Sequence, residues 1–153
     1  MKKFGSFSFI VFSTLLFISL WGSIETARGD DWRMFYESPD GSKSYYNVNF
    51  VKQKDIVQVY TKDYLSDDQK RKMLEMRKND RLPVNGWDRF GYNEWLTEID
   101  CKERRARALK GASYENNGKV LDSSPSDWKG EWRTIPPGTA IAIENLFQKV
   151  CSK

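Results

Sequence analysis

The 153 residues of this chain include no His. The side chains that could do chemistry are therefore its carboxylates, its two cysteines, and its clusters of basic and aromatic residues. Without His, neither a Ser-His-Asp nor a Cys-His nucleophile can form, and neither can a His-ligated zinc or haem site. Two cysteines are also too few for a Cys₄ zinc or iron–sulfur site. Composition therefore favours a binding module over an enzyme, and we expect no metal and no cofactor.

Carboxylates offer the remaining enzymatic route. Two acidic side chains at a suitable separation can hydrolyse a glycosidic bond, and Glu94, Glu98 and Asp100 lie close together in the sequence. Acidic residues on strand faces are common, however, and no sequence feature indicates a cleft or a raised pKa. We expect no enzymatic activity. A small carboxylate-based hydrolase is the alternative, and a deep pocket holding Glu98 and Asp100 would favour it.

Two clusters of basic residues could attract an anionic partner. They lie at residues 70–81 and 102–110. Phosphate, sulfated sugars and acidic protein surfaces are drawn to such clusters. The alternative is a solvated surface whose charge is balanced by neighbouring acids. The candidate binding residues in the two clusters are Lys70, Arg71, Lys72, Arg77, Lys78, Arg81, Arg105 and Arg107.

Aromatic residues form a third candidate surface. Trp87, Phe90, Tyr92 and Trp95 crowd into a short stretch of the sequence. Aromatic side chains supply rigid contact area with a polar edge to a sugar or protein ligand. Trp also fills the core of small sheet proteins, and we favour a core position for Trp95 and Trp132. For Trp87, which lies in a loop bounded by Gly and Pro, a contact surface and a core position both stay open.

Residues 1–29 have the layout of a secretory signal peptide. Two Lys begin the segment, an apolar stretch follows over residues 4–24, and Ala27 and Gly29 place small residues before a cleavage site. An uncleaved anchor is the alternative, since about 20 apolar residues can just span a bilayer. We expect cleavage, which leaves residues 30–153 as a single exported domain, periplasmic or secreted, with no stable membrane span. No Cys lies near the cleavage site, so we expect no lipid anchor.

The segment that follows cleavage carries 22 basic and 20 acidic side chains, a net charge of +2. This charge is too small to argue for nucleic acid as a partner. Its two cysteines, Cys101 and Cys151, form an even pair, which in an oxidising compartment predicts a disulfide. A redox or nucleophilic thiol is the alternative. It is disfavoured, because the chain has neither a C-x-x-C motif nor a His to lower a thiol pKa.

The elements that position these residues follow from periodicity. Residues 32–36 are rich in aromatic side chains, and residues 45–51 and 56–61 alternate along the chain, so these segments predict three antiparallel strands. Ser66 is a helix cap, and the acidic and helix-forming residues after it predict a short surface helix ending at Asn79. Residues from Arg81 to Gly91 indicate an irregular connection.

The second half returns to strands and ends in a helix. Residues 95–102 and 104–114 alternate with period two, Asn117-Gly118 predicts a tight turn, and residues 119–121 begin a return strand. Apolar residues recur at steps of three and four over residues 140–151, which predicts an amphipathic helix. The fold class is α+β: an antiparallel sheet of about six strands, a C-terminal helix packed on it and clamped by one disulfide, and an inserted surface helix.

This arrangement resembles the surface-adhesin protein E-like family. The resemblance rests on the aromatic first strand at Trp32, on Ile-Asp-Cys at residues 99–101, and on the W-x-x-I-x-P spacing of residues 132–137 before a helix that ends at Cys151. It covers most of residues 30–153. The family implies a small exported bacterial domain, with a sheet and a helix held by this disulfide and without enzymatic activity. Its name-giving member is an adhesin that engages host extracellular proteins.

We therefore expect an exported, non-enzymatic envelope or surface domain that binds another macromolecule. The ligand would be a protein or an acidic glycan, with host extracellular matrix as one source, and the predicted surface is segment 65–92 together with neighbouring basic strand residues. A periplasmic inhibitor or accessory partner of another envelope protein is the alternative.

Overall fold

The computed structural model describes residues 31–139 and 141–152, so the predicted signal peptide lies outside the described residues. The described residues form an antiparallel sheet with two α-helices, which confirms the α+β prediction. The elements are β1 (Trp32–Glu37), β2 (Lys43–Asn47), β3 (Val51–Gln53), β4 (Ile56–Tyr64), α1 (Asp67–Asn79), the 3₁₀ helix η1 (Trp87–Arg89), β5 (Phe90–Asp100), β6 (Arg105–Glu115), β7 (Val120–Ser123), β8 (Arg133–Thr134) and α2 (Ala142–Cys151).

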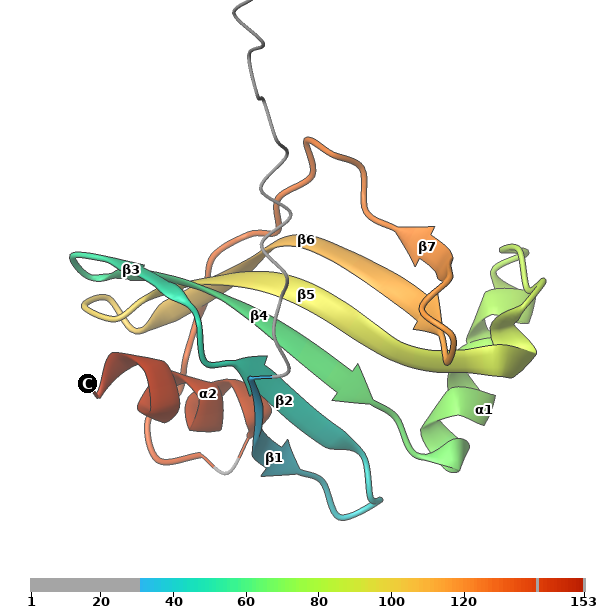
Figure 1. Cartoon of the computed structure of the whole chain (residues 1–153), viewed down its shortest axis with the longest axis horizontal. Coiled ribbons are helices and arrows are strands. Elements are labelled where there is room, and N and C mark those ends of the chain that lie inside the picture. The colour runs from blue at the N-terminus through green and yellow to red at the C-terminus, as the bar shows by residue number, and fades with distance from the viewer. Residues whose placement is uncertain (1–30, 140, 153) are drawn as a thin grey trace, which may run out of the picture.

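The sheet has the strand order β1-β2-β4-β5-β6-β7, and the short strands β3 and β8 pair with β4 and β6. The six strands of this main order match the number predicted. Helix α2 packs near β1 on one side of the sheet, and α1 lies at the end where β5 begins (Figure 1). The long β5–β6 hairpin turns back at the opposite end of the sheet.

The outer edge of β6 is covered along most of its length. Strand β7 pairs with residues 112–114 of β6 and β8 pairs with residues 105–106. Between them, the backbone N–H of Ser124 donates to the carbonyl of Gly111 at 2.9 Å, and that of Gly130 donates to the carbonyl of Ala108 at 2.8 Å. The chain from β7 to β8 therefore occupies most of the hydrogen-bonding positions of this edge.

Several strand boundaries differ from the prediction, and two of the differences have a clear local cause. The predicted strand 45–51 breaks after Asn47, because the Asn47 side chain accepts a hydrogen bond from the N–H of Asn49 at 2.9 Å and turns the chain. Strand β5 begins at Phe90, five residues before the predicted start. Gly91 permits this early start: a Cβ there would lie 2.8 Å from the backbone nitrogen of Asn116, so only Gly allows the strand to pass this close to the β6–β7 turn.

The core lies between the sheet and α2. Val57 and Val59 of β4 and Ile99 of β5 are fully buried, and α2 covers them with Leu146 and Val150. The side chains at alternate positions of each strand share one face, so the predicted alternation of β4 and β5 is confirmed.

The predicted apolar face of α2 is confirmed in part. Phe147 and Val150 are buried, whereas Ile143 is only half-buried at the margin of the core. The helix also buries Leu146 and the carboxylate of Glu144, which its apolar spacing did not indicate.

Three contacts hold α2 to the β5–β6 turn. The predicted disulfide joins Cys101 to Cys151, with the two Cα atoms 5.6 Å apart. The Arg104 guanidinium donates to Glu144 at 2.6 Å and lies 4.2 Å from the centre of the Phe147 ring. A hydrogen bond from the Gln148 amide, followed by the charge of Arg104, lowers the pKa of Glu144. The buried carboxylate is therefore ionised and paired, as burial of a charge requires.

Helix α1 is the surface helix that the sequence predicts. The Ser66 Oγ accepts a hydrogen bond from the N–H of Gln69 at 3.3 Å, and Asp67 and Asp68 occupy the first turn. None of its residues is buried. After the helix, Arg81 has φ +56°, and the N–H of Leu82 bonds back into the last turn.

A polar row crosses the α2 side of the sheet near its α1 end. Ser44, Asp63, Asn93 and Ser113 stand in register on four neighbouring strands. The Ser44 hydroxyl donates to Asp63 at 2.6 Å and the Ser113 hydroxyl donates to Asn93 at 2.7 Å. Burial raises the pKa of Asp63, and the Ser44 hydrogen bond opposes this only in part.

The raised pKa of Asp63 predicts that Asp63→Asn stabilises the protein at neutral pH. A carboxyl whose pKa is raised by folding binds its proton more tightly in the folded protein. The free energy of unfolding therefore falls as the pH rises from the ordinary carboxyl pKa through the raised one. The Asn side chain is neutral and its oxygen still accepts from Ser44. The melting temperature at pH 7 should rise, and the gain should vanish in acid, where Asp63 is protonated in both states.

Circular dichroism melts between pH 3 and pH 8 measure this effect. The exposed Asp127→Asn is the matched control and should leave the melting temperature nearly unchanged at every pH. A lower melting temperature for Asp63→Asn at pH 7 would show that the charge of Asp63 is stabilised rather than penalised.

Candidate functional site

The sheet face opposite α2 carries a row of tyrosines. Alternate residues of each strand point to this face, which we call the open face. Tyr45, Tyr64, Tyr92 and Tyr114 lie side by side on it, one each from β2, β4, β5 and β6. We call them the tyrosine row. Successive ring centres are 5.6, 5.5 and 5.0 Å apart. Tyr64 is 42% exposed and the other three are half-buried.

A lysine and a tryptophan complete this aromatic area. The Lys62 Nζ lies 4.3 Å from the Trp32 ring centre and 4.9 Å from that of Tyr92, which is cation–π geometry. It also lies 3.9 Å from Glu94. Burial is the main cause that raises the pKa of Tyr64 and of Tyr92. Both phenols are therefore neutral at physiological pH and can donate hydrogen bonds.

Trp32, Lys43, Tyr45, Lys62 and Tyr64 line a pocket of about 520 Å³ on this face, which we call the Trp32 pocket. Its residues come from β1, β2 and β4. The volume falls in the range of small-ligand sites. Three aromatic rings and two ammonium groups form its lining, without a carboxylate.

The candidate residues Arg105 and Arg107 also lie on the open face, nearer the β5–β6 turn, and both are paired. Arg107 donates to Glu98 at 2.8 and 2.5 Å, and Arg105 donates to Asp100 at 3.1 and 3.0 Å. Both guanidinium groups lie over the Trp132 ring, 4.8 Å from its centre for Arg105 and 4.4 Å for Arg107. These two ion pairs neutralise the basic character predicted for this part of β6.

The same pairs decide how Glu98 and Asp100 can act. Burial alone would raise the pKa of Glu98, but hydrogen bonds from Gln58 and Arg107 outweigh it and lower the pKa. The N–H of Glu103, and then Arg105, lower the pKa of Asp100. A glycosidase needs one carboxyl with a raised pKa as its acid. Neither carboxylate lines any of the pockets described, so this geometry does not support the hydrolase alternative.

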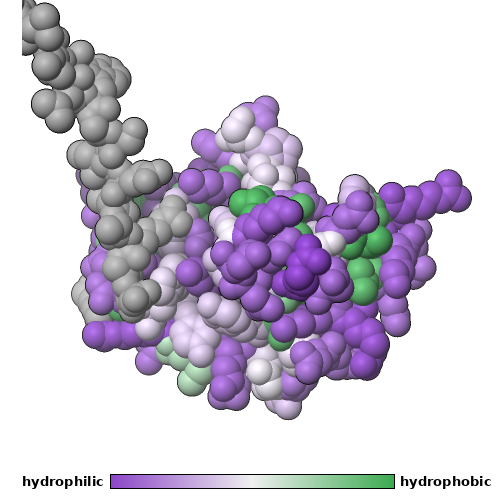
Figure 2. All heavy atoms as spheres, turned by 45° about the vertical axis from the view of Figure 1, so that its right-hand side comes forward, coloured by the Kyte–Doolittle hydropathy of each residue, from purple (hydrophilic) through white to green (hydrophobic). Residues whose placement is uncertain are grey.

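The basic residues of α1 form a separate surface at the other end of the sheet (Figure 1). Several of them pair with acids: Lys70 with Asp67 at 4.0 Å, Arg71 and Lys72 with Asp68, and Arg77 with Asp122 at 3.0 Å. Lys78 and Arg81 have no ion pair with a described residue. The structure therefore does not join segment 65–92 and the basic strand residues into the one surface that was predicted. Figure 2 brings the α1 end toward the viewer and shows mostly hydrophilic residues with smaller apolar areas between them.

Trp87 lies in the interior rather than on the surface. Its side chain is 6% exposed. The ring stacks on Phe90 with centres 5.7 Å apart, and the Arg77 guanidinium covers it at 3.8 Å. Gly86, with φ +82°, provides the turn that directs Trp87 inward. The alternative of a contact surface at Trp87 is therefore wrong.

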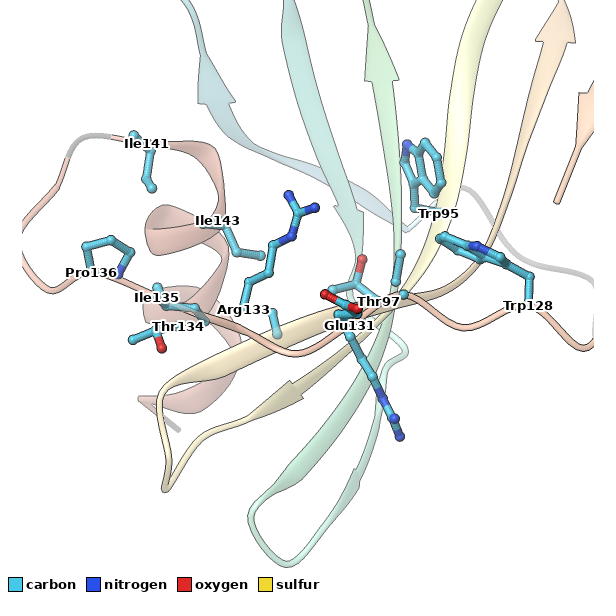
Figure 3. A pocket seen from close by; sticks show the side chains of 14 residues that line it. Trp95, Thr97, Trp128, Glu131, Arg133, Thr134, Ile135, Pro136, Ile141 and Ile143 are labelled. Atoms are coloured by element: carbon cyan, nitrogen blue, oxygen red, sulfur yellow. The ribbon is translucent and has the colours of Figure 1, made fainter.

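The core positions favoured for Trp95 and Trp132 are also wrong, because both side chains are half-buried and lie outside the main core. Trp95 lies flat over Gly111, where a Cβ would come within 2.2 Å of its ring. A side chain at position 111 would clash with this ring, so the packing of Trp95 needs the glycine. Its outer edge faces solvent beside Trp128 (Figure 3).

A groove of about 660 Å³ runs from these tryptophans to α2 (Figure 3). Ile135 and Ile143 contribute apolar surface at its α2 end, and Glu131 and Arg133 are charged residues of opposite sign in its lining. This mixed charge does not select one class of ligand.

Metal binding and membrane crossing are two further properties that residues 31–139 and 141–152 could support. This part of the chain contains no group of three or more His, Cys, Asp or Glu residues that could hold a metal ion. None of its helices has the length and apolar character needed to cross a membrane.

Comparison with known protein families gives a match. The family model of surface-adhesin protein E matches residues 32–152. Searches of curated proteins and of solved structures gave no match. The matched region runs from the first residue of β1 to the residue after α2, and it includes both cysteines of the disulfide. The chain belongs to the surface-adhesin protein E family.

Proposed function

We propose that this protein is an exported, non-enzymatic adhesin-like domain that binds a macromolecule through the open face of its sheet. The observation that carries the proposal is the tyrosine row, which crosses four strands and leaves aromatic surface in contact with solvent. The family of surface adhesins supports export and a binding role. Residues 1–29 serve as the cleaved signal peptide in this proposal, and residues 30–153 as the single exported domain.

Aromatic rings on a sheet face suit this role for two physical reasons. Tyr and Trp carry a large share of binding energy in interfaces, because they are rigid and combine apolar area with a polar group. Side chains on paired strands are also held at fixed spacings by the backbone hydrogen bonds between them. A partner that meets the tyrosine row therefore contacts a pre-organised surface, which lowers the entropy cost of binding.

The partner in this proposal is a host extracellular-matrix protein or its acidic glycans. The basic residues of α1, which we call the α1 cluster, form a second surface of different chemistry, and no residue of this helix is buried. Exposed ion pairs contribute little net energy and weaken with salt. The open face is therefore the stronger candidate, and the α1 cluster provides the matched comparison.

Immobilised purified matrix glycoproteins test this proposal directly. We expect Tyr64→Ser/Tyr92→Ser to weaken binding by at least about tenfold, as loss of interface hot spots does. The charge reversal Lys70→Glu/Arg71→Glu/Lys72→Glu should change affinity by less than about threefold at physiological salt, since these side chains are half-buried or exposed and already paired. Biolayer interferometry gives both values, and circular dichroism checks that each variant folds.

The opposite pattern would assign binding to α1 instead. In that case the charge reversal abolishes binding, the tyrosine variant retains it, and affinity falls steeply as salt rises. If the wild-type protein binds none of the matrix glycoproteins, the adhesin-like role itself is refuted.

A further inference from the structure

We infer that the Trp32 pocket binds a sugar unit that carries a carboxylate, such as a hexuronate or a sialic acid. The inference rests on the proposed function, because the pocket lies on the open face beside the tyrosine row. It adds the chemical class of the ligand and the residues that would recognise it.

The walls of the pocket suit a saturated ring. The rings of Tyr45 and Tyr64 stand at 85° to each other with centres 5.6 Å apart, and Trp32 contributes a third ring to the lining. Two perpendicular aromatic planes form a corner that can contact a pyranose on two sides, through the apolar C–H groups of the sugar. The Tyr64 side chain remains 42% exposed, so this surface is accessible.

The charges of the pocket select an anion. Lys43 and Lys62 are the two charged residues of the lining, and both are positive. The Lys62 ammonium is held over Trp32 and Tyr92, which fixes its position among the aromatic rings. Its contact with Glu94 is long, at 3.9 Å, and Glu94 is not part of the pocket lining.

An ammonium group has three N–H donors, so Lys62 can donate to a ligand carboxylate while it keeps the Glu94 contact. Lys43 is similarly available, because its pairing with Glu37 at 3.6 Å joins two side chains that are 45% and 49% exposed. Such exposed pairs exchange readily for a better partner. A neutral sugar would use the aromatic walls and leave both ammonium groups without a new acceptor.

Single-stranded nucleic acid also stacks on aromatic side chains of a sheet, but the charge pattern of the open face disfavours it. Nucleic-acid sites of that kind follow the phosphate backbone with a continuous positive groove. Beyond the Trp32 pocket, the open face carries Glu94, Glu98 and Asp100 along β5. A ligand with one carboxylate can bind the two lysines of the Trp32 pocket, whereas the successive phosphates of a nucleic acid would meet the acidic residues of β5.

Titration with matched oligosaccharides tests the inference. Sialyllactose is compared with lactose, and a hyaluronan tetrasaccharide with chitotetraose, so that each acidic probe has a neutral counterpart. We expect one acidic probe to bind at least about tenfold more tightly than its neutral counterpart, and which one binds identifies the source of the carboxylate. Isothermal titration calorimetry gives the affinities, and shifts of the Trp32 indole signal in NMR spectra locate the site.

Three variants assign the effect to the pocket. Lys62→Gln should lower affinity for the acidic probe by about tenfold or more, because a charge-assisted hydrogen bond is lost, and should leave affinity for the neutral probe unchanged. Lys43→Gln should act in the same direction and, being exposed, avoids any effect on folding. Lys110→Gln is the matched control: this lysine lies over Tyr60 on the same face, outside the Trp32 pocket, and its loss should change affinity by less than twofold.

Several outcomes would overturn the inference. These are equal binding of acidic and neutral probes, insensitivity to both pocket lysine variants, and a response only to sulfated sugars or to oligothymidylate. Matrix glycoproteins treated with sialidase and hyaluronidase separate this inference from the proposed function. If they still bind through the tyrosine row with full affinity, the proposed function stands and the carboxylate-sugar inference fails. If the untreated glycoproteins do not bind but the acidic oligosaccharide does, the proposed function fails and the pocket inference stands; if neither binds, both fail.

Discussion

Replacing both cysteines by serine lowers the free energy of unfolding by about 4 kcal/mol, the largest single loss that we predict. The disulfide joins residues 50 positions apart, and in the chain-entropy model a crosslink across a loop of this length restricts the unfolded state by about that amount. The bond connects α2 directly to the turn of the central hairpin. Urea unfolding of Cys101→Ser/Cys151→Ser against the oxidised wild type measures the difference.

Wild-type protein unfolded in reductant is the control, and its midpoint should match that of the double variant. Mass spectrometry should show that the purified wild type lacks two hydrogens and has no thiol that can be alkylated. A double variant whose stability equals that of the oxidised wild type would mean that Arg104, Glu144 and the apolar face hold α2 by themselves, without help from the crosslink.

Truncating Ile135 produces the second large loss, about 3 kcal/mol. Ile135 lies outside the regular elements, after the two-residue strand β8, yet its side chain is 1% exposed and belongs to the main core. Ile→Ala at a fully buried position removes burial and leaves a cavity, which costs about 2–5 kcal/mol. The N–H of Ile135 also donates to the carbonyl of Arg104 at 2.8 Å, so the backbone cannot readily move to fill the space.

The matched variant is Ile141→Ala, six residues farther along the same connection. Its side chain is 43% exposed, and we expect a change within about 0.5 kcal/mol. Chemical denaturation of both variants provides the comparison. Similar small losses at the two positions would show that the connection before α2 is not part of the core.

The sequence predicted correctly those elements that depend on interactions between residues close together in the chain. The helix cap at Ser66, the turn at Gly118 and the alternation of β4 all depend on neighbouring residues, and the structure confirms each of them. The alternation predicted over residues 104–114 is interrupted, because the register of β6 against β5 shifts by one residue between Ala108 and Lys110. The disulfide was equally predictable, because an even pair of cysteines in an exported chain has few alternatives.

The open face could not be predicted in the same way. The tyrosine row requires the register of β2 against β4 and of β4 against β5, and a shift of one residue would move every side chain to the other face. Tyr64 and Tyr92 are 28 positions apart and separated by α1. The alternation of Tyr60, Lys62 and Tyr64 was a usable signal, but only together with that register.

Charge composition misled the prediction for a physical reason. A run of basic residues in sequence does not reveal which acids the fold brings to it. Arg105 and Arg107 face Asp100 and Glu98 across the β5–β6 hairpin, and Arg77 meets Asp122 from β7. Trp87 was ambiguous for a similar reason, since its cover comes from Arg77, ten positions earlier on α1.

The unequal edges of the sheet limit how copies of this protein can join. An unpaired strand edge is a template for another chain, and a fibre of stacked sheets needs an open edge on both sides of every copy. At the β6 side the connection from β7 to β8 already occupies most of that template, and the strands on its own outer edge are short, with 4 residues in β7 and 2 in β8. At the other side β1 has 6 residues, ends the strand order and pairs with β2 alone among the described strands. Short edge strands are one way in which proteins limit edge-to-edge pairing. Contact between two β1 edges is therefore favoured over contacts that continue through β7, which limits open-ended polymerisation.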